Sequence, residues 1–278
     1  MMEHLPEWLA AWFSRDWGAT LAYLTNGKHL AWYASLRYTL IAAVAGAVLA
    51  VGFGLVGAAL KQSRITPLRW IGNVYTTMVR GIPDVLFLLF FPLAFEQGIE
   101  YLMAQWHCSP EQLQQATGWP LCSEAQWYLS TTEYLILACV SLGLVYGAFA
   151  ANVIYGAMQA VPKGQLEAAH AYGFTPRQVF WQFQVRQMWI YALPGLSNVW
   201  MLLLKATSLL SLLQINDIVA WADRLGAPNY LPMAGLVHDD WRWKYYLVLF
   251  LFYILMTLFS ERLFEKLQNR AGRGMVRG

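Results

Sequence analysis

The side chains that could carry out chemistry are few and widely spaced in this sequence. No nucleophile stands beside a candidate base, and no Gly-x-x-x-x-Gly-Lys-Ser/Thr phosphate loop is present. The histidines fall in predicted loops and termini without metal-ligand spacing; they are His4, His29, His107, His170 and His238. The sequence therefore predicts no metal site, no bound cofactor and no ATP hydrolysis by this chain, and it disfavours an enzyme.

Polar side chains inside or beside long apolar stretches could instead contact a polar solute. The candidates are Asp84, Glu133, Asn152, Tyr155, Asn198 and Lys205. A carboxylate in hydrocarbon costs on the order of 2.5–3.5 kcal/mol unless it is paired or hydrated. Asp84 therefore needs either Arg80, four residues earlier on the same predicted helix face, or water on a transport path, and we favour the ion pair. Structural roles are also open: Glu133 as a solvated cap, Lys205 as a snorkelling lysine and Asn152 as a packing residue.

The composition indicates an all-helical integral membrane protein. Of the 278 residues, 58% are hydrophobic and 13% are charged, whereas a soluble domain carries about 25% charged residues. Because about 20 apolar residues span a bilayer, we expect five spans, at residues 38–60, 81–103, 134–161, 187–216 and 245–260. Residues 5–17 are rich in Trp and Leu and are expected to form a helix in the membrane interface, with no cleaved signal peptide.

The distribution of Lys and Arg predicts the orientation of the spans. None occurs from residue 81 to 162, so the polar connection 96–128 is expected outside the cytoplasm. Lys and Arg concentrate instead in residues 61–69, in 163–186 and in the C-terminal tail, which are expected in the cytoplasm. The net charge of +3 follows from this topology and requires no nucleic-acid partner. An oxidising outer compartment would permit a disulfide between Cys108 and Cys122.

Small residues recur at every fourth position along the first span, where they would let another helix approach closely. The series is Ala42, Gly46, Ala50, Gly54 and Ala58. Prolines are expected to interrupt the second and fourth spans, at Pro83, Pro92 and Pro194. Such breaks are tolerated where backbone groups find partners in protein or water, so they mark candidate lining of a path, with kinks that serve only packing as the alternative.

Residues 161–178 lie between two apolar stretches and predict a short helix, a tight turn and a new helix. Alanines favour the first helix and leave a shallow surface, and Gly173 is suited to a left-handed C-cap. Thr175, with Pro176 at the first helical position and Gln178 three residues on, predicts a capping box. This segment is expected to be a rigid element outside the bilayer.

Several motifs together resemble the permeases of polar amino-acid ABC importers, closest to the histidine and basic amino-acid branch, over roughly residues 37–278. They are Glu167-Ala168-Ala169 with Gly173, the preceding Arg80-Gly81-Ile82-Pro83-Asp84, and the later Ala192-Leu193-Pro194-Gly195-Leu196-Ser197-Asn198 and Lys205-Ala206-Thr207-Ser208. The resemblance implies the type I importer (MetI-like) fold with a cytoplasmic coupling helix. It also implies that an ATPase docks on Lys163, Gly164, Glu167, Ala168, Ala169, Tyr172 and Gly173.

The chain departs from these apparent relatives at three positions. They commonly carry Glu at the position of Asn152 and often Arg at that of Tyr155, and a proline where this chain has Arg186. Docking is expected to persist. The two lost charges fit a divided pair in which another permease carries substrate-recognition residues.

The resemblance implies the membrane subunit of an importer of polar, mainly basic, amino acids such as histidine, arginine, lysine or ornithine. Its expected partners are a periplasmic binding protein, a second related permease and an ATPase dimer that binds ATP and Mg and docks at Glu167. The expected organisation is an outer or interfacial segment 1–31, a permease domain 32–265 with coupling loop 162–177, and a basic cytoplasmic tail 266–278, in the bacterial inner membrane. The alternative, an ion- or proton-coupled secondary transporter, is disfavoured because five spans show no inverted repeat.

Overall fold

The computed structural model describes residues 17–213, 215–231 and 237–272, which are helical apart from turns, loops and an isolated β-bridge between Asn229 and His238. Five helical segments are long and apolar enough to cross a membrane, as the composition predicts. They are α3 (Gly27–Gln62), α5 (Asp84–His107), α7 (Thr131–Ala160), the succession Pro176–Leu213 and α12 (Arg242–Ala271). The predicted interfacial helix lies outside the described residues except for its last residue, which begins α2 (Trp17–Leu24).

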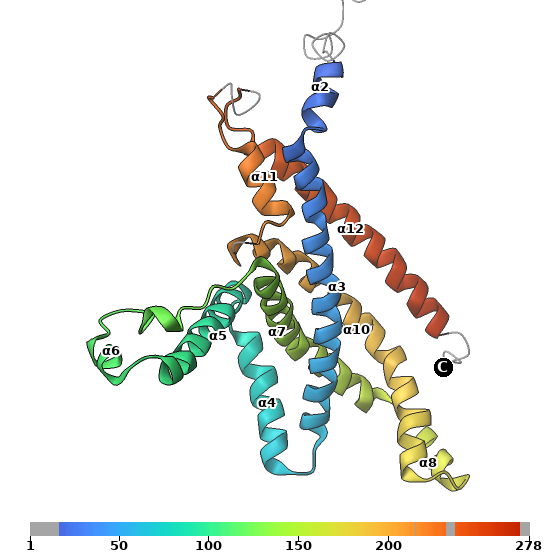
Figure 1. Cartoon of the computed structure of the whole chain (residues 1–278). Coiled ribbons are helices and arrows are strands. Elements are labelled where there is room, and N and C mark those ends of the chain that lie inside the picture. The colour runs from blue at the N-terminus through green and yellow to red at the C-terminus, as the bar shows by residue number, and fades with distance from the viewer. Residues whose placement is uncertain (1–16, 214, 232–236, 273–278) are drawn as a thin grey trace, which may run out of the picture.

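Helices α3 and α7 form the most extensive helix pair of the described chain, and α3 runs almost the full height of the molecule in Figure 1. The five small residues at every fourth position of α3 are all buried, so the predicted packing stripe is confirmed. A Cβ atom added to Gly54 would lie 2.7 Å from the Cβ of Ala150 on α7. The small side chains therefore allow the close approach of the two helices.

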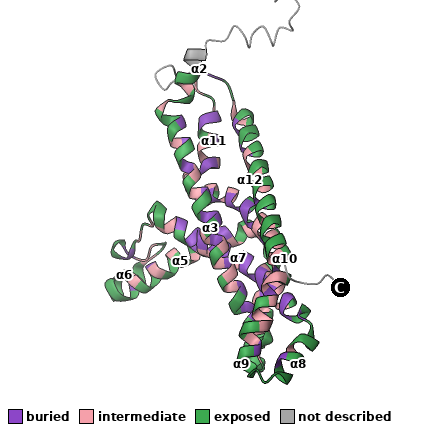
Figure 2. Cartoon of the chain, turned by 90° about the vertical axis from the view of Figure 1, so that its right-hand side faces the viewer, coloured by how far each residue is buried: buried purple, intermediate pink, exposed green. Residues whose placement is uncertain are grey.

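The remaining helices surround this pair. Helix α10 (Val185–Ala206) packs on α7, with Gly195 against Val153, and α4 (Thr66–Gly81) returns beside α3. Buried residues concentrate where α3, α7 and α10 meet (Figure 2). Helix α12 contacts α10 and α11 (Ile218–Gly226) but keeps most of its apolar side chains exposed.

The second span differs from the sequence prediction. Residues 66–81 form the separate helix α4, the chain leaves helical geometry at Ile82 and Pro83, and α5 begins at Asp84. Proline at 83 favours this break because it disfavours helical geometry at the residue before it. Pro92 and Pro194, in contrast, lie inside continuous helices, so the predicted interruptions at these two positions are wrong.

Two further sequence predictions need correction at the helix ends. The last span does not stop at residue 260, because α12 continues to Ala271 and takes in the start of the expected tail. His29 is not a loop residue: it is fully buried in α3, where its ring nitrogens lie 3.0 Å from Asn26 Oδ1 and 2.9 Å from the Tyr245 hydroxyl. These hydrogen bonds join the beginnings of α3 and α12.

Asp217 is a second buried polar group that the sequence reading did not single out. It is the N-cap of α11, and its Oδ1 accepts a hydrogen bond from the backbone N–H of Ala220 at 2.9 Å. Its Oδ2 is buried and has no hydrogen-bond partner in the part of the chain that the structure describes. Burial raises the pKa of this carboxyl to about 6, against the opposing effect of backbone N–H groups.

Candidate functional site

Helix α8 (Lys163–Ala171) has the defined ends that its sequence predicts. Gly173 adopts a φ of 84°, in the left-handed region that favours glycine. The N–H of Gly173 donates to the carbonyl of His170 at 2.9 Å, and the N–H of Phe174 donates to the carbonyl of Ala169 at 3.2 Å. This pair of bonds is a Schellman motif, which satisfies carbonyl groups that the helix end leaves free.

The chain re-enters helix directly after this turn. Thr175 and Gln178 form the predicted capping box, in which the Thr175 N–H donates to Gln178 Oε1 at 2.9 Å and the Gln178 N–H donates to Thr175 Oγ1 at 3.4 Å. The short helix α9 (Pro176–Gln178) then continues as a π-helical segment, η2 (Val179–Gln184), before α10 begins. A π-helical segment at this place could not be read from the sequence.

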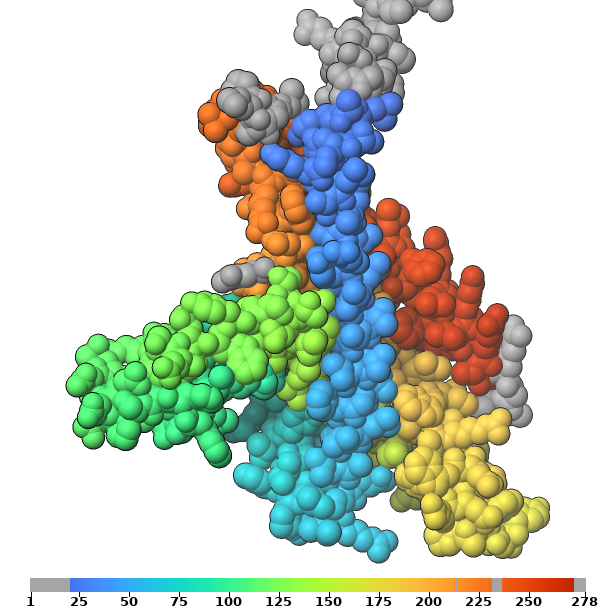
Figure 3. Space-filling model, in the orientation of Figure 1, coloured from blue at the N-terminus to red at the C-terminus, as the bar shows by residue number. Residues whose placement is uncertain are grey.

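One side of α8 is fixed to the bundle and the other is free. Leu166 packs against a core cluster that includes Ala58 of α3, Ile154 of α7 and Met188 of α10. Ala169 is buried as well, whereas Tyr172 is 86% exposed. In the space-filling view α8 projects at the lower right of the molecule (Figure 3).

The residues expected to dock on an ATPase therefore divide into two groups. Ala169 faces the bundle and cannot make a direct contact with a docked protein. The exposed members are Lys163, Gly164, Glu167, Ala168, Tyr172 and Gly173. Their side chains form a shallow surface that ends in an exposed aromatic ring.

The predicted ion pair between Asp84 and Arg80 does not form. The helix break at residues 82–83 places the two on different helices, so the spacing of four no longer puts them on one face. Asp84 Oδ2 instead accepts a hydrogen bond from the Tyr146 hydroxyl at 2.6 Å. Arg80 lies over the ring of Phe149, with Cζ 5.1 Å from the ring centroid.

Two other predicted path residues come together around a lysine. Lys61, which the sequence reading placed in a loop, lies in the last turn of α3 and donates from Nζ to the Oδ1 atom of Asn152. The same Nζ lies 4.9 Å from the ring centroid of Tyr155. Asp84, Arg80 and Lys61, from three other helices, therefore contact α7 at successive positions from Tyr146 to Tyr155.

The other predicted path residues lie elsewhere. Glu133 is exposed and forms a capping box with Ser130 at the start of α7, which is its expected structural role. Asn198 lies on α10 and lines a hollow of about 240 Å³ shared with Glu261 and other residues of α12. Lys205 is exposed in the last turn of α10. The structure does not bring these three residues to the contacts that Asp84, Arg80 and Lys61 make with α7.

Comparison with known proteins agrees with this architecture. The family of binding-protein-dependent transport system inner membrane components matches residues 50–273, most of the chain. The chain belongs to this family. The permease is 32% identical over 241 residues to the histidine/lysine/arginine/ornithine transport system permease protein HisQ of Salmonella typhimurium, covering 86% of this chain and 92% of HisQ.

Other relatives support the same assignment. The permease is 27% identical to the arginine ABC transporter permease protein ArtQ of Escherichia coli, covering 83% of this chain and 90% of ArtQ. A crystal structure of an amino acid ABC transporter with histidines superposes with a TM-score of 0.65 at 20% identity, covering 92% of this chain and 99% of that one. The permease thus has the ABC importer permease fold, and it is the transport subunit, separate from the subunit that hydrolyses ATP.

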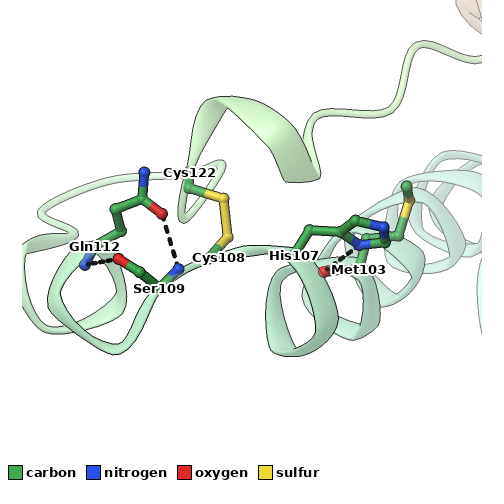
Figure 4. The surroundings of a disulfide bond; sticks show 6 residues. All are labelled: Met103, His107, Cys108, Ser109, Gln112 and Cys122. Atoms are coloured by element: carbon green, nitrogen blue, oxygen red, sulfur yellow. Dashed lines mark hydrogen bonds between the residues drawn. A yellow bond between two sulfur atoms is a disulfide. The ribbon is translucent and has the colours of Figure 1, made fainter.

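A lobe that is expected outside the cytoplasm, and that we call the outer lobe, is held by a disulfide and a buried carboxylate. This lobe consists of the end of α5, α6 (Pro110–Gln115) and η1 (Ser123–Ala125), and it projects from the left side in Figure 3. Cys108 and Cys122 are bonded, beside a capping box formed by Ser109 and Gln112 (Figure 4).

Glu100, which the sequence reading missed, is the carboxylate that ties this lobe together. Its side chain is buried and accepts hydrogen bonds from the Trp119 indole N–H and from the backbone N–H of Trp127, the latter at 3.0 Å. An acidic residue in a largely apolar helix, which also holds Asp84 and Glu96, is the only sequence signal that could have marked it. The lobe therefore depends on both a covalent and a polar cross-link.

Loss of the disulfide should loosen the outer lobe without unfolding the spans. Closing a loop of this length stabilises a folded segment by about 3 kcal/mol in the chain-entropy description. We expect Cys108→Ala to increase the rate of limited proteolysis between residues 109 and 130. Cys139→Ala, at a buried free cysteine of α7, is the matched control. Equal digestion of the two variants would contradict a stabilising role of the bond.

In the described residues no group of three or more His, Cys, Asp or Glu side chains is placed to hold a metal ion. The residues that meet at α7 but were not marked as path candidates from the sequence are Lys61, Arg80, Tyr146 and Phe149. For the two aromatic residues a signal was present as spacing, because Tyr146 and Phe149 precede Asn152 and Tyr155 at intervals of three residues. Residues three apart are neighbours on a helix surface.

Proposed function

We propose that this permease carries polar amino acids, mainly basic ones, into the cytoplasm as part of an ATP-driven importer. The observation that carries the proposal is a rigid, exposed helix, α8, attached to the inner part of the bundle in a chain of this transport family. The substrate class is that of relatives such as HisQ, the permease of a histidine, lysine, arginine and ornithine transport system. The expected partners are a periplasmic amino-acid-binding protein, a second related permease and an ATPase that binds ATP and Mg.

The proposed orientation places α8 in the cytoplasm, the N-terminus in the periplasm and the C-terminus in the cytoplasm. The connection between α3 and α4 and the α8 segment lie at the same lower end of the molecule in Figure 1, and both are rich in Lys and Arg. The outer lobe 96–128 has neither residue type. Positive residues favour the cytoplasmic side.

The proposed mechanism is mechanical transmission. A docked ATPase would push on the free side of α8, while Leu166 on the fixed side contacts a cluster built from α3, α7 and α10. Three spans would therefore respond to one displacement. The Schellman turn and the following capping box leave few ways for the segment to bend instead.

The transport proposal is tested by uptake into proteoliposomes that contain the permease with its partner permease and ATPase. Each radiolabelled standard amino acid, and ornithine, is supplied with the loaded binding protein outside and ATP inside. Uptake of histidine, arginine, lysine or ornithine that requires all three partners is the expected result. Uptake that persists without the ATPase would instead support a secondary transporter.

The orientation predicts opposite labelling of two exposed positions. In intact spheroplasts, a membrane-impermeant maleimide should modify a Gln114→Cys variant in the outer lobe but not a Tyr172→Cys variant next to α8. After permeabilisation both should react, because both side chains are exposed. Labelling of the Tyr172→Cys variant in intact spheroplasts would place α8 outside and remove the basis for ATPase docking.

A further inference from the structure

Four side chains of α7, at intervals of three residues, meet charged side chains of the α3–α4–α5 segment. They are Tyr146, Phe149, Asn152 and Tyr155, which we call the α7 row. Their spacing of three residues distributes them over about 14 Å of helix length. Asp84, Arg80 and Lys61 contact this row in order from its first member to its last.

The two cations that contact the α7 row, Lys61 and Arg80, have only neutral partners in it. Lys61 contacts an amide and an aromatic ring, and Arg80 contacts an aromatic ring. Neither forms an ion pair within the described chain, where both ion pairs belong to Arg242. The carboxylate of Asp84 is engaged by the Tyr146 hydroxyl. The α7 row is therefore contacted by two positive charges that have no paired carboxylate.

The two cations approach neighbouring positions of α7. Arg80 lies over Phe149 and Lys61 donates to Asn152, and residues three apart are neighbours on a helix surface. Holding like charges close together in a membrane protein is costly unless an anion joins them or water surrounds them. Arg80 is exposed and Lys61 is half-buried, so an anion has access from the Arg80 side.

The backbone beside these cations is irregular. Ile82 and Pro83 separate α4 from α5, and both residues are exposed. Non-helical backbone at membrane depth is tolerated where it is covered by protein or lines a water-filled cavity. In transporters such broken helices commonly supply substrate-binding groups. The charge pair and the helix break thus indicate the same surface as part of a solute path.

We propose that Lys61 and Arg80 form an anion subsite that holds the α-carboxylate of the amino acid in transit. This inference rests on the proposed function, because it requires that an amino acid pass along this face. A guanidinium and an ammonium that approach neighbouring residues of α7 suit a carboxylate, which can accept hydrogen bonds at both oxygens. The α7 row is the support that positions the two cations.

The subsite recognises the group that all amino acids share. Its two positive charges repel a cationic side chain, and the carboxylate of Asp84 contacts the first residue of the row, Tyr146, whereas Lys61 contacts the last two. Recognition of a basic side chain must therefore come from other residues of the assembled transporter. The subsite predicts that this subunit contributes general amino-acid affinity rather than selectivity among side chains.

The isosteric variant Asn152→Asp separates an anion subsite from a structural contact. It places a carboxylate on Lys61 without changing the shape of the side chain, so it would compete with the substrate and yet preserve the α3–α7 contact. Lys61→Gln and Arg80→Gln remove each charge directly. Lys244→Gln is the matched control, because Lys244 also lies over an aromatic ring, 3.9 Å from the Trp241 centroid, at the start of α12.

The measurement is equilibrium binding to the assembled permease–ATPase complex in nanodiscs. The probes are the amino acid taken up fastest by the wild type and its decarboxylated amine, such as arginine with agmatine or histidine with histamine. We expect the three subsite variants to weaken amino-acid binding by about tenfold or more, which is about 1.4 kcal/mol. Binding of the amine and all binding by Lys244→Gln should stay at the wild-type level.

Two results would overturn the subsite alone. Equal weakening of amino acid and amine would show that the cations only hold the helices together, and unchanged amino-acid binding in all three variants would show that the carboxylate lies elsewhere. In both cases wild-type uptake of amino acids remains, so the proposed function stands. A wild-type transporter that takes up no amino acid would remove both proposals together.

Discussion

Replacing Gly54 by leucine should prevent the permease from reaching its folded state. A Cβ atom at this position would lie 2.7 Å from the Cβ of Ala150 and 3.2 Å from its carbonyl carbon, so the backbone of α7 itself must move. Forcing extra methylenes into a packed interior costs about 1–3 kcal/mol, and more where the backbone cannot give way. Fluorescence-detected gel filtration in detergent should show loss of the monodisperse peak, and the Tm of any remaining protein should fall.

Gly52→Leu is the control for this prediction, because it adds the same side chain to the same helix. Gly52 is exposed, and a Cβ atom there would meet nothing within 4 Å. It should therefore fold with a Tm close to that of the wild type. If Gly54→Leu behaves like Gly52→Leu, α3 and α7 are not packed as described.

The helices that could be predicted from sequence are those whose signals are local or periodic. The small residues of α3 repeat at the spacing of a helix face, and the end of α8 depends on Gly173 and on the capping residues that follow it. Each of these patterns is compatible with few backbone conformations. The stripe and the capping residues were accordingly predicted correctly, but the helix that packs on the stripe was not predicted.

The breaks in helices were predictable only in part. Pro83 ends one helix and begins another, whereas Pro92 and Pro194 are accommodated inside α5 and α10. A proline shows where a backbone N–H is missing, but whether the helix continues depends on neighbours that the sequence does not place. The wrong expectation for Arg80 and Asp84 followed from this, since the ion pair placed both residues on one helix face across the break expected at Pro83.

The polar residues of α7 were predicted as candidates, but the side chains that they contact were not predicted. Asn152 and Tyr155 stood out because they interrupt an apolar span, but their partner Lys61 comes from the far end of α3. The long side chain of lysine can reach back along a helix from a loop-like position in the sequence. A contact of this kind joins distant parts of the chain and needs the packing of α3 on α7 to be known first.

The coupling helix offers a test that leaves the core intact, because the Gly173 position has open space around it and strain only in its backbone. A Cβ atom there would meet nothing within 4 Å, but φ is 84°. A side chain in this left-handed region costs about 1–2 kcal/mol, and a β-branched residue is especially unsuited to it. Substitution should therefore change the shape of the turn between α8 and α9 while the five spans remain folded.

Gly173→Val should uncouple ATP hydrolysis from transport. We expect an assembled complex with basal ATPase activity, no stimulation by the loaded binding protein, and uptake near background in proteoliposomes. Gly98→Val, at another uncrowded glycine but in α5, should keep both activities.

Glu167→Lys tests the exposed surface of α8 without altering its turn and should weaken co-purification of the ATPase. If Gly173→Val and Glu167→Lys both retain stimulated hydrolysis and uptake, α8 does not transmit the motion of the ATPase.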